Sequence, residues 1–239
     1  MAKMTLDKIL QKQGFGTRKE CQQRILNGDV SMAGTVVEDY ELFMEPDGLE
    51  FTVDGESWRY REHVYLLLNK PPDVECSRKP SHHPGVLSLL PRSFDLRDVQ
   101  PVGRLDFDTT GMLLMSDDGA FIHAQSSPKR HVPKTYVATT HDPVTEELVA
   151  KLLKGVKLDR EPAPLAAQAC RQLDSHRIEI VLDQGKYHQV KRMLVAAGGH
   201  CDALSRTAIG RLQLDSFNLK EGEWCYLEPE HLALLAPVS

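Results

Sequence analysis

Two aspartates in a glycine-bounded loop are the side chains of this sequence best placed to carry out chemistry. Asp106 and Asp108 lie within residues 103–111 (GRLDFDTTG), and the apolar run 112–115 follows directly. A carboxylate at the mouth of a loop is held by the adjacent strand while solvent and substrate can still reach it. The alternative is an Asx turn, in which either carboxylate accepts hydrogen bonds from nearby backbone amides. The residues of this loop alone favour the Asx turn.

Short strands and two helices are expected to position this loop. Apolar runs bounded by Gly, Pro or Asp-rich turns predict the strands, which cover residues 64–68, 111–115, 136–140 and 177–182. One helix is expected over about residues 143–153 and another over residues 188–197, and a glycine ends each of them. Residues 61–239 are therefore predicted to form an α+β domain of catalytic size with a mainly antiparallel sheet.

The first 60 residues form a smaller unit with a different pattern. Two helices are expected, and the second begins with a capping box between Thr17 and Glu20. A hairpin and a further strand are expected within residues 30–53. The polar stretch 54–62 is interpreted as a linker, so the first predicted domain covers residues 1–60.

Positive charge is concentrated on a few segments of an acidic chain. The net charge is −5, from 29 basic and 34 acidic residues, yet residues 3–24 carry six basic side chains against two acidic ones. Residues 25–58 then hold nine acids and no base, while residues 185–201 hold three basic residues and no acid. Local basic segments are expected where a protein contacts the phosphates of a nucleic acid, and solvated helix faces explain them equally well from charge alone.

Composition disfavours several other classes of protein. Hydrophobic residues make up 41% of the chain and charged residues 26%, which is enough apolar side chain for a folded core. The longest apolar run is far shorter than the ~20 residues of a membrane helix, and the N-terminus lacks the apolar segment of a signal peptide. The five cysteines are scattered without a C-x-x-C spacing, as expected for reduced thiols in the cytoplasm rather than for disulfides or a zinc site.

The N-terminal pattern resembles the αL RNA-binding module, an S4-like domain shared with a small-subunit ribosomal protein. The matching residues are Leu6-Asp7-Lys8-Ile9-Leu10, Gly14, Thr17-Arg18 and Leu26-x-Gly28-x-Val30-x-Met32-x-Gly34. Thr5 stands where the family usually has an arginine, so one phosphate contact of the family is expected to be missing. Arg18 and Lys19 lie in the first turn of a helix, where the dipole disfavours cations, and an anion outside the helix is expected to neutralise them.

Five motifs in the rest of the chain are similar to those of the RsuA-type ribosomal RNA pseudouridine synthases, and they occur in the family's order. The central motif is the loop 103–111 with the strand and the Asp118-Gly119 turn that follow it. The other motifs are Leu68-Asn69-Lys70-Pro71-Pro72, Lys134-Thr135-Tyr136, residues 185–193 (GKYHQVKRM) and Leu204-x-Arg206-x-x-Ile209-Gly210. Asp73 replaces the glycine that usually follows the first motif. Among the subfamilies the chain is most similar to the small-subunit (16S) enzyme of the uridine-516 type, because it has the N-terminal module and lacks a long basic C-terminal extension.

The resemblance implies an isomerase that converts one uridine of ribosomal RNA to pseudouridine. This reaction breaks the base–ribose bond, rotates the uracil and rejoins it through carbon, so it requires no cofactor and no metal. By carry-over from the family, Asp106 is the nucleophile and Tyr136 stacks on the extruded base, an interaction worth roughly 1–3 kcal/mol. Arg104 is expected to fill the gap in the base stack or to bind a phosphate nearby.

A cation is expected beside the nucleophile, because a buried carboxylate stays ionised only when a positive charge is close. Lys191 takes the position at which the family pairs its nucleophile. Helical spacing of the apolar residues puts Lys191 and its neighbour Arg192 off the core face, in a first turn where cations need an anion. Asp106 or an RNA phosphate would supply that anion, and Arg192 could exchange roles with Lys191.

The remaining basic and polar residues of these motifs are expected to bind RNA. They are Lys8, Lys12, Arg18, Lys19 and Arg24 in the N-terminal unit, and Lys134, His188, Gln189, Arg192 and Arg206 in the catalytic domain. The expected partner is ribosomal RNA within a small-subunit assembly intermediate. The expected state is a cytoplasmic monomer that does not associate with membranes.

Three alternatives remain open. The substrate could be large-subunit rather than small-subunit ribosomal RNA. A non-catalytic RNA-binding or ribosome-assembly factor would share the N-terminal module, although a degenerate relative would be expected to lack the acid, the tyrosine or the lysine. A glycoside hydrolase would also use paired carboxylates such as Asp106 and Asp108, but it would have no use for an RNA-binding module.

Overall fold

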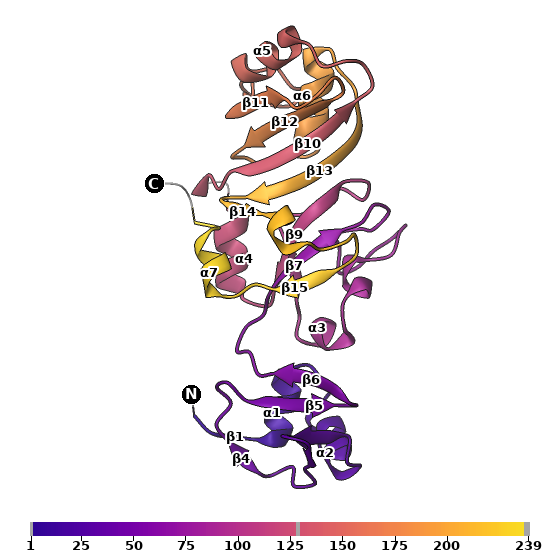
Figure 1. The fold of residues 1–239 in the computed structure, drawn as a ribbon, viewed down its shortest axis with the longest axis vertical. Coiled ribbons are helices and arrows are strands. Elements are labelled where there is room, and N and C mark those ends of the chain that lie inside the picture. Colours follow the sequence, from indigo (N-terminus) through magenta and orange to yellow (C-terminus); the bar gives the residue numbers. More distant parts are fainter. Residues whose placement is uncertain (1, 128–129, 237–239) are drawn as a thin grey trace. The chain divides into compact units, whose positions relative to one another are not determined.

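The computed structural model describes residues 2–127 and 130–236, and these form two compact units (Figure 1). Unit 1 comprises the chain up to Val64 together with Leu90–Val99, and unit 2 comprises Tyr65–Leu89 and the chain from Gln100 onward. The segment 90–99, which the sequence pattern placed in the catalytic domain, therefore belongs to unit 1. Within the described residues no helix is long and apolar enough to cross a membrane.

Unit 1 contains short helices and two small antiparallel sheets. Its helices are α1 (Leu6–Lys12), α2 (Arg18–Leu26) and α3 (Arg92–Leu96). One sheet pairs β1 (Met4–Thr5) with β4 (Phe43–Met44). The other has the order β3 (Thr35–Val36), β2 (Val30–Met32), β5 (Glu50–Val53) and β6 (Glu56–Arg59).

The expected capping box is present, whereas the expected linker is not. The Thr17 hydroxyl accepts a hydrogen bond from the Glu20 backbone N–H, and the Glu20 carboxylate accepts one from the Thr17 N–H. The prediction that residues 54–62 form a linker was wrong, because they include strand β6. Asp54 and Gly55 both have positive φ, at 52° and 82°, which suits the tight turn of a β5–β6 hairpin.

Segment 90–99 completes the core of unit 1. The Phe94 ring is 2% exposed and meets the Trp58 ring edge-on, with centroids 6.2 Å apart. Arg97 donates hydrogen bonds to the Gln13 side chain and to the carbonyl oxygens of Arg61 and Glu62. Removal of residues 1–60 would therefore expose the Phe94 ring. Point variants consequently test the role of unit 1 better than a deletion does.

Asp7 is a buried carboxylate that joins α1 to α2. It accepts hydrogen bonds from the Thr5 hydroxyl at 2.5 Å, from Arg18 Nε at 2.7 Å and from Gln22 Nε2 at 2.7 Å. Burial alone would raise the pKa of Asp7, but these hydrogen bonds and one from the Lys8 backbone N–H lower it to about 2. The anion expected beside Arg18 is thus supplied from within unit 1.

The lowered pKa of Asp7 predicts an acid-sensitive unit 1. The pKa lies below the ordinary value of 3.8, so the ionised carboxylate stabilises the folded unit above about pH 4 and loses this effect as the pH falls towards 2. We expect Asp7→Asn to lower the free energy of unfolding of unit 1 at neutral pH by about 2 kcal/mol. Amide hydrogen exchange of α1 and α2 measures this change. The wild type and Asp7→Asn should become closer in free energy of unfolding as the pH falls from 5 towards 2. A difference that stays constant over this range would contradict the lowered pKa of Asp7.

Unit 2 is built on one large sheet. The strand order is β11 (Ala169–Gln172), β12 (Arg177–Leu182), β10 (Lys134–Thr140), β13 (Cys201–Ile209), β9 (Thr110–Ser116), β7 (Tyr65–Lys70) and β15 (Trp224–Tyr226). Beside this row, β8 (Gln100–Val102) pairs with β9 and β14 (Leu212–Gln213) pairs with β13. Within the described residues every strand pair of this sheet is antiparallel except β9 with β13. The predicted α+β fold with a mainly antiparallel sheet is confirmed.

Helices and 3₁₀ turns connect these strands. They are η1 (Val86–Leu89), α4 (Gly119–Ser126), α5 (Glu146–Lys154), α6 (Gln189–Ala197), η3 (Leu214–Phe217) and α7 (Pro229–Ala233). The prediction of a turn at Asp118-Gly119 was wrong, because α4 begins there. The Asp118 carboxylate accepts hydrogen bonds from the backbone N–H groups of Ala120 and Phe121, as a helix N-cap does.

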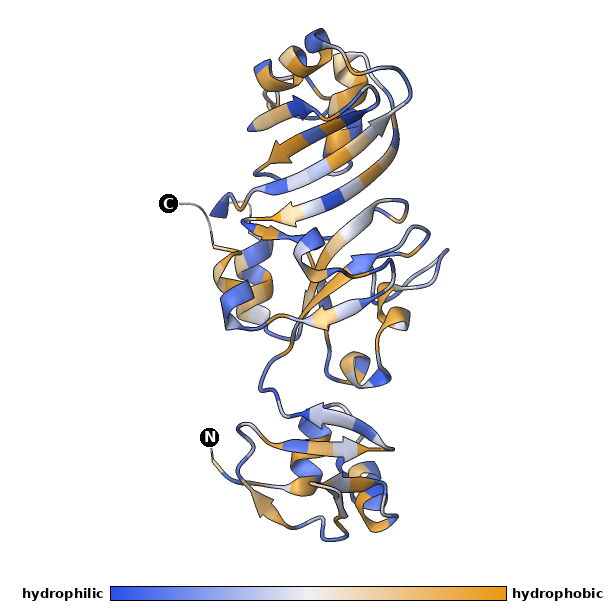
Figure 2. Cartoon of the chain, viewed as in Figure 1, coloured by the Kyte–Doolittle hydropathy of each residue, from blue (hydrophilic) through white to orange (hydrophobic). Residues whose placement is uncertain are grey.

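Many residues in the strands of this sheet are hydrophobic (Figure 2). Residues 66–68 of β7 and 112–115 of β9 are at most 1% exposed, whereas buried and partly exposed residues alternate along β10 and β13. Strands β7 and β9 are therefore covered on both faces, whereas β10 and β13 are buried on one face only. This rigid sheet supports the loop that enters β9.

The parallel contact between β9 and β13 lies where that loop enters the sheet. Its register pairs Gly111 with Arg206 and Thr110 with Ser205. Gly111 has a φ of +95°, and a Cβ atom there would lie 2.4 Å from the Arg206 carbonyl oxygen. Only glycine fits this close approach of two backbones. The preceding aspartates are thereby anchored at the junction of three strands, β9, β13 and β10.

Candidate active site

The aspartate loop, which we define as residues 103–109 between β8 and β9, is held from one side by a buried lysine. Lys70, at the end of β7, has no exposed area, and its Nζ donates hydrogen bonds of 2.9 Å to the carbonyl oxygens of Pro71, Phe107 and Thr109. Burial lowers the pKa of Lys70 below its ordinary value. The sequence pattern included Lys70 in a motif but gave it no role, and the structure shows that it positions the loop.

A buried arginine holds the other side of the aspartate loop. Arg206, on β13, is 1% exposed, and its guanidinium donates to the carbonyl oxygens of Gly103 at 2.9 Å and Met112 at 2.8 Å. These two carbonyls flank the loop where it leaves β8 and where it has entered β9. These hydrogen bonds hold the aspartate loop, and the expectation that Arg206 binds RNA stays a prediction.

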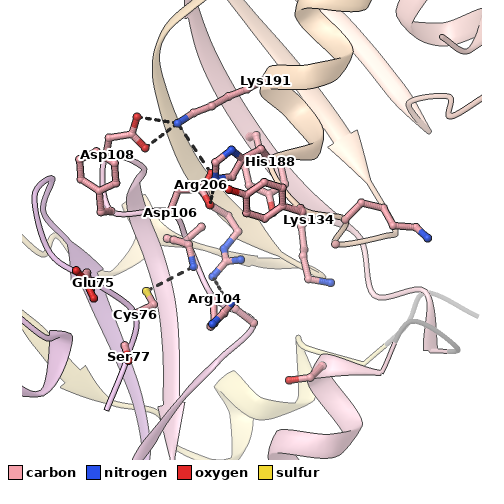
Figure 3. A pocket seen from close by; sticks show the side chains of 18 of the residues that line it. Glu75, Cys76, Ser77, Arg104, Asp106, Asp108, Lys134, His188, Lys191 and Arg206 are labelled. Atoms are coloured by element: carbon pink, nitrogen blue, oxygen red, sulfur yellow. Dashed lines mark hydrogen bonds and ion pairs between the residues drawn. The ribbon is translucent and has the colours of Figure 1, made fainter. Parts of the chain in front are cut away.

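Asp106 lies next to Lys191 of α6 and to His188, the residue that precedes this helix (Figure 3). His188 Nε2 lies 3.2 Å from Asp106 Oδ1, and Lys191 Nζ lies 3.9 Å from Asp106 Oδ2. The side chain of Asp106 is 28% exposed, so its carboxylate is partly screened from solvent but still accessible. The contacts of this carboxylate are with cationic or titratable side chains, unlike those expected of an Asx turn.

Lys191 makes its shortest contacts with the second aspartate. Its Nζ donates to both oxygens of Asp108, at 2.6 and 2.8 Å, and Figure 3 shows the ammonium group between the two carboxylates. The ion pair expected between Lys191 and Asp106 is therefore shared, and Asp108 is the closer partner. One cation beside two carboxylates reduces their mutual repulsion and orients both.

The site residues border one cavity of about 1160 Å³. The residues of the sequence-based hypothesis that line it are Arg104, Asp106, Lys134, Tyr136, His188, Lys191 and Arg206. This volume exceeds the roughly 300–1,000 Å³ of typical small-molecule pockets. The cavity is therefore large enough for a ligand bigger than a typical small molecule. Within the described residues no group of three or more His, Cys, Asp or Glu could hold a metal ion.

Tyr136 and Lys134 come from one strand, β10. Tyr136 is 9% exposed and borders the cavity, so the ring is firmly packed but one part of it faces the open space. Lys134 Nζ donates to the carbonyl oxygen of Val132 at 3.0 Å. Burial, followed by the charge of Arg206, lowers the pKa of Lys134 to about 8. Arg104, on the aspartate loop, is exposed and lines the cavity.

Residues at the start of α6 differ in what they contact. His188, the N-cap residue, has a φ of 47° and turns its ring towards Asp106. Gln189 was expected to bind RNA, but it is 5% exposed and its side-chain oxygen accepts a hydrogen bond from the Lys186 N–H at 3.0 Å. Arg192 donates to the carbonyl oxygens of Asp159 and Tyr187. Gln189 and Arg192 thus stabilise the surrounding loops.

The five basic residues of unit 1 that were expected to bind RNA divide into two groups. Lys8, Lys12 and Lys19 are exposed, and Lys12 lies 3.6 Å from Glu62 Oε1. Arg24 forms a 2.6 Å ion pair with Asp54 and Arg18 binds Asp7, so intramolecular carboxylates occupy both guanidinium groups. The three lysines are therefore the better candidates for phosphate contacts.

The role of Lys70 can be tested by its stability effect. Lys70→Met retains the length of the side chain but leaves three carbonyl groups without their donor, so we expect the free energy of unfolding of unit 2 to fall by about 2–4 kcal/mol. Calorimetric unfolding measures the change. The matched control is Lys154→Met on the exposed surface of α5, which should change stability by less than about 0.5 kcal/mol. Equal stability of the two variants would show that the buried lysine does not support the loop.

Three comparisons with known proteins agree on the class of protein. A family model described as RNA pseudouridylate synthase matches residues 64–196. An uncharacterised RNA pseudouridine synthase, YtzG of Bacillus subtilis, is 38% identical over 97% of this chain and 98% of its own. Ribosomal small subunit pseudouridine synthase A of Escherichia coli is 33% identical over 96% of this chain and 99% of its own.

A solved structure extends the similarity to three dimensions. A crystal structure of a pseudouridylate synthase has a TM-score of 0.68 and 32% sequence identity, covering 98% of this chain and 100% of that chain. Because the match covers nearly the whole chain, it includes the large sheet and the aspartate loop that enters β9. The fold, the family model and the full-length relatives therefore place this chain in the RsuA-type family of RNA pseudouridine synthases.

Proposed function

We propose that this enzyme, acting as a monomer, converts one specific uridine of small-subunit (16S) ribosomal RNA to pseudouridine, with Asp106 as the nucleophile. The observation that carries the proposal is the position of the Asp106 carboxylate, which borders the cavity beside Lys191 and His188. Support for the small subunit comes from relatives such as the Escherichia coli protein named ribosomal small subunit pseudouridine synthase A, which aligns over nearly its whole length.

The chemistry requires the target base to leave the RNA stack and enter the cavity. There the Tyr136 ring, packed on β10, stacks on the uracil, and the ionised Asp106 attacks the nucleotide. The base–ribose bond breaks, the uracil turns and the ribose rejoins it at a ring carbon. The hydrogen of that carbon is lost and the former glycosidic nitrogen gains one, so substrate and product are isomers.

Two structural features prepare Asp106 for this step. Lys70 and Arg206 hold the backbone of the aspartate loop through buried hydrogen bonds to its carbonyl groups. The ammonium of Lys191 supplies positive charge next to the nucleophile before the substrate arrives. Because these groups are already in place, little reorganisation is needed when the carboxylate reacts.

Activity on isolated RNA tests the proposal. The purified enzyme is incubated with protein-free small-subunit rRNA, with partly assembled small subunits and with large-subunit rRNA, and pseudouridine is located by carbodiimide-dependent stops of reverse transcription. We expect one modified uridine in the small-subunit RNA, formed most efficiently in the assembly intermediate. Modification confined to large-subunit RNA would overturn the small-subunit assignment, and no modification in any RNA would overturn the rRNA proposal.

Unit 1 is proposed to be an S4-like module that binds the phosphates of the rRNA. Its exposed Lys8, Lys12 and Lys19 give it positive charge on α1 and α2, whereas residues 25–58 hold nine acids and no base. The alignments with full-length relatives include this part of the chain. A phosphate-binding module would raise affinity without taking part in the chemical step.

Substitution of the three lysines Lys8, Lys12 and Lys19 by alanine should weaken RNA binding and lower its salt dependence. Each phosphate contact that is lost reduces the slope of log affinity against log salt by roughly 0.7–0.9. The magnitude of this slope should therefore be smaller by about 2 to 3 in the triple variant than in the wild type. Fluorescence anisotropy over a range of KCl concentrations measures the slope. Lys154→Ala in unit 2 is the control, and an unchanged slope in the triple variant would show that these lysines do not contact RNA.

A further inference from the structure

Two pairs of stacked aromatic rings border the cavity that contains Asp106. The Phe107 ring stacks on His83, with centroids 4.8 Å apart and an interplanar angle of 6°. The Tyr187 ring stacks on His188, with centroids 3.8 Å apart and an angle of 17°. Phe107 and Tyr187 have no part in the chemistry described above, although each is next to it: Phe107 follows Asp106 in the chain, and His188 contacts Asp106.

Both outer rings are exposed to solvent, and both residues line the cavity. Phe107 is 45% exposed and Tyr187 is 74% exposed, even though one ring of each pair covers the other. Single exposed apolar side chains are common on protein surfaces. Two exposed rings that line one cavity, on separate segments that both adjoin the nucleophile, form a more specific arrangement.

The Phe107 pair is held in a fixed position. The Phe107 carbonyl oxygen accepts a hydrogen bond from buried Lys70, which fixes the backbone beneath the ring. Its partner His83 lies in a loop whose backbone N–H groups at Ser81, His82 and His83 all donate to the carboxylate of Glu75. The ring therefore does not need to be ordered when a ligand stacks on it.

The Tyr187 pair is held in a comparable way. The Tyr187 carbonyl oxygen accepts a hydrogen bond of 3.3 Å from Arg192 Nη1, and the backbone of Lys186 donates to buried Gln189. Lys186 and Arg104 are exposed and line the same cavity as the two rings, and Lys186 also forms a 3.3 Å ion pair with Glu161. Aromatic rings interleaved with cations are the features by which proteins bind single-stranded nucleic acid.

We propose that Phe107 and Tyr187 are stacking platforms for the two bases that flank the target uridine, one platform for each neighbour in the RNA strand. The inference rests on the proposed function, because it takes the occupant of the cavity to be a uridine within an RNA strand. The cavity of about 1160 Å³ has room for more than the target nucleotide. Once the target base is extruded, both of its neighbours lose a stacking partner, and these rings replace it. Because any base can stack on an aromatic ring, the platforms fix the path of the RNA strand and do not select its sequence.

Fluorescence of 2-aminopurine tests the proposal, because stacking quenches this base. The probe is a short single-stranded oligoadenylate with a central uridine, carrying 2-aminopurine directly 5′ or directly 3′ of that uridine. We expect the wild-type enzyme to quench both probes. Phe107→Leu should lose quenching at one neighbour and Tyr187→Leu at the other, with affinity reduced about 5- to 100-fold in each case.

Matched variants separate stacking from general damage to the site. Phe107→Trp and Tyr187→Phe retain a ring and should retain quenching, whereas Leu153→Ala, at a position as exposed as Phe107 but on α5, should behave as wild type. Absence of quenching by the wild type, or equal quenching by wild type and both leucine variants, would overturn the proposal. The probe carries no ribosomal sequence and no turnover is measured, so this result is independent of whether the enzyme modifies small-subunit rRNA.

Discussion

Replacement of Asp106 by asparagine is expected to abolish pseudouridine formation while RNA affinity stays within a factor of two to three of wild type. Asparagine has nearly the same shape as aspartate but lacks the ionised oxygen that attacks the nucleotide, so the rate should fall by at least about 10⁴-fold. Its amide still fits between His188 and Lys191, which preserves the cavity. Single-turnover assays with tritiated uridine measure the rate, and anisotropy measures the affinity.

Asp108→Asn is the matched control for this prediction. It lies two residues away in the same loop, and its carboxylate is 49% exposed and bound to Lys191. This variant removes the same charge from the same loop but should retain measurable activity, because Asp108 supports Lys191 rather than attacking the substrate. Appreciable turnover by Asp106→Asn would show that Asp106 is not the nucleophile. If only Asp108→Asn lost all activity, Asp108 would be identified as the nucleophile.

Lys191→Met should produce the second largest loss of activity. The variant removes the positive charge shared by Asp106 and Asp108 and leaves two carboxylates facing each other without a cation. Removal of one charged group that stabilises a reacting centre typically costs about 10²–10³-fold in rate. Because Lys191 contacts the carboxylates, the loss should appear in kcat, with KM for RNA nearly unchanged.

The conservative variant Lys191→Arg tests whether charge explains this effect. Arginine keeps the charge but cannot reproduce the compact ammonium between two carboxylates, so part of the activity should remain. Arg192→Met serves as a control, because the guanidinium of Arg192 donates to the carbonyl oxygens of Asp159 and Tyr187. A native rate in Lys191→Met, together with a large loss in Arg192→Met, would identify Arg192 as the functional cation.

The sequence pattern alone predicted six elements of unit 2, but not β8 or β13, which adjoin the aspartate loop. The strands that became β7, β9, β10 and β12 and the helices that became α5 and α6 follow from apolar periodicity and from glycine stops. Strand β6 was missed because its residues are mostly polar and exposed, so it lacks an apolar signal. Helix α4 was missed because aspartate followed by glycine suits a turn as well as a helix N-cap.

Long-range relations were beyond the reach of residue spacing. Asp106, Tyr136 and Lys191 border one cavity although they come from distant segments, and only the family resemblance brought them together in advance. Arg206 and Lys70 show the limit most clearly. A basic residue in a motif can bind phosphate or satisfy buried carbonyl groups, and the sequence does not distinguish the two. The insertion of segment 90–99 into unit 1 likewise depends on tertiary packing.

Pseudouridine mapping of ribosomal RNA from cells tests the central claim most directly. RNA from cells that lack this gene is compared with RNA from the same cells complemented by the wild-type enzyme or by Asp106→Asn. We predict that one small-subunit uridine is unmodified in the deletion strain, is converted to pseudouridine with the wild-type enzyme and remains uridine with Asp106→Asn expressed to the same level. An identical pseudouridine pattern in all three strains, or restoration of the modification by Asp106→Asn, would contradict the account.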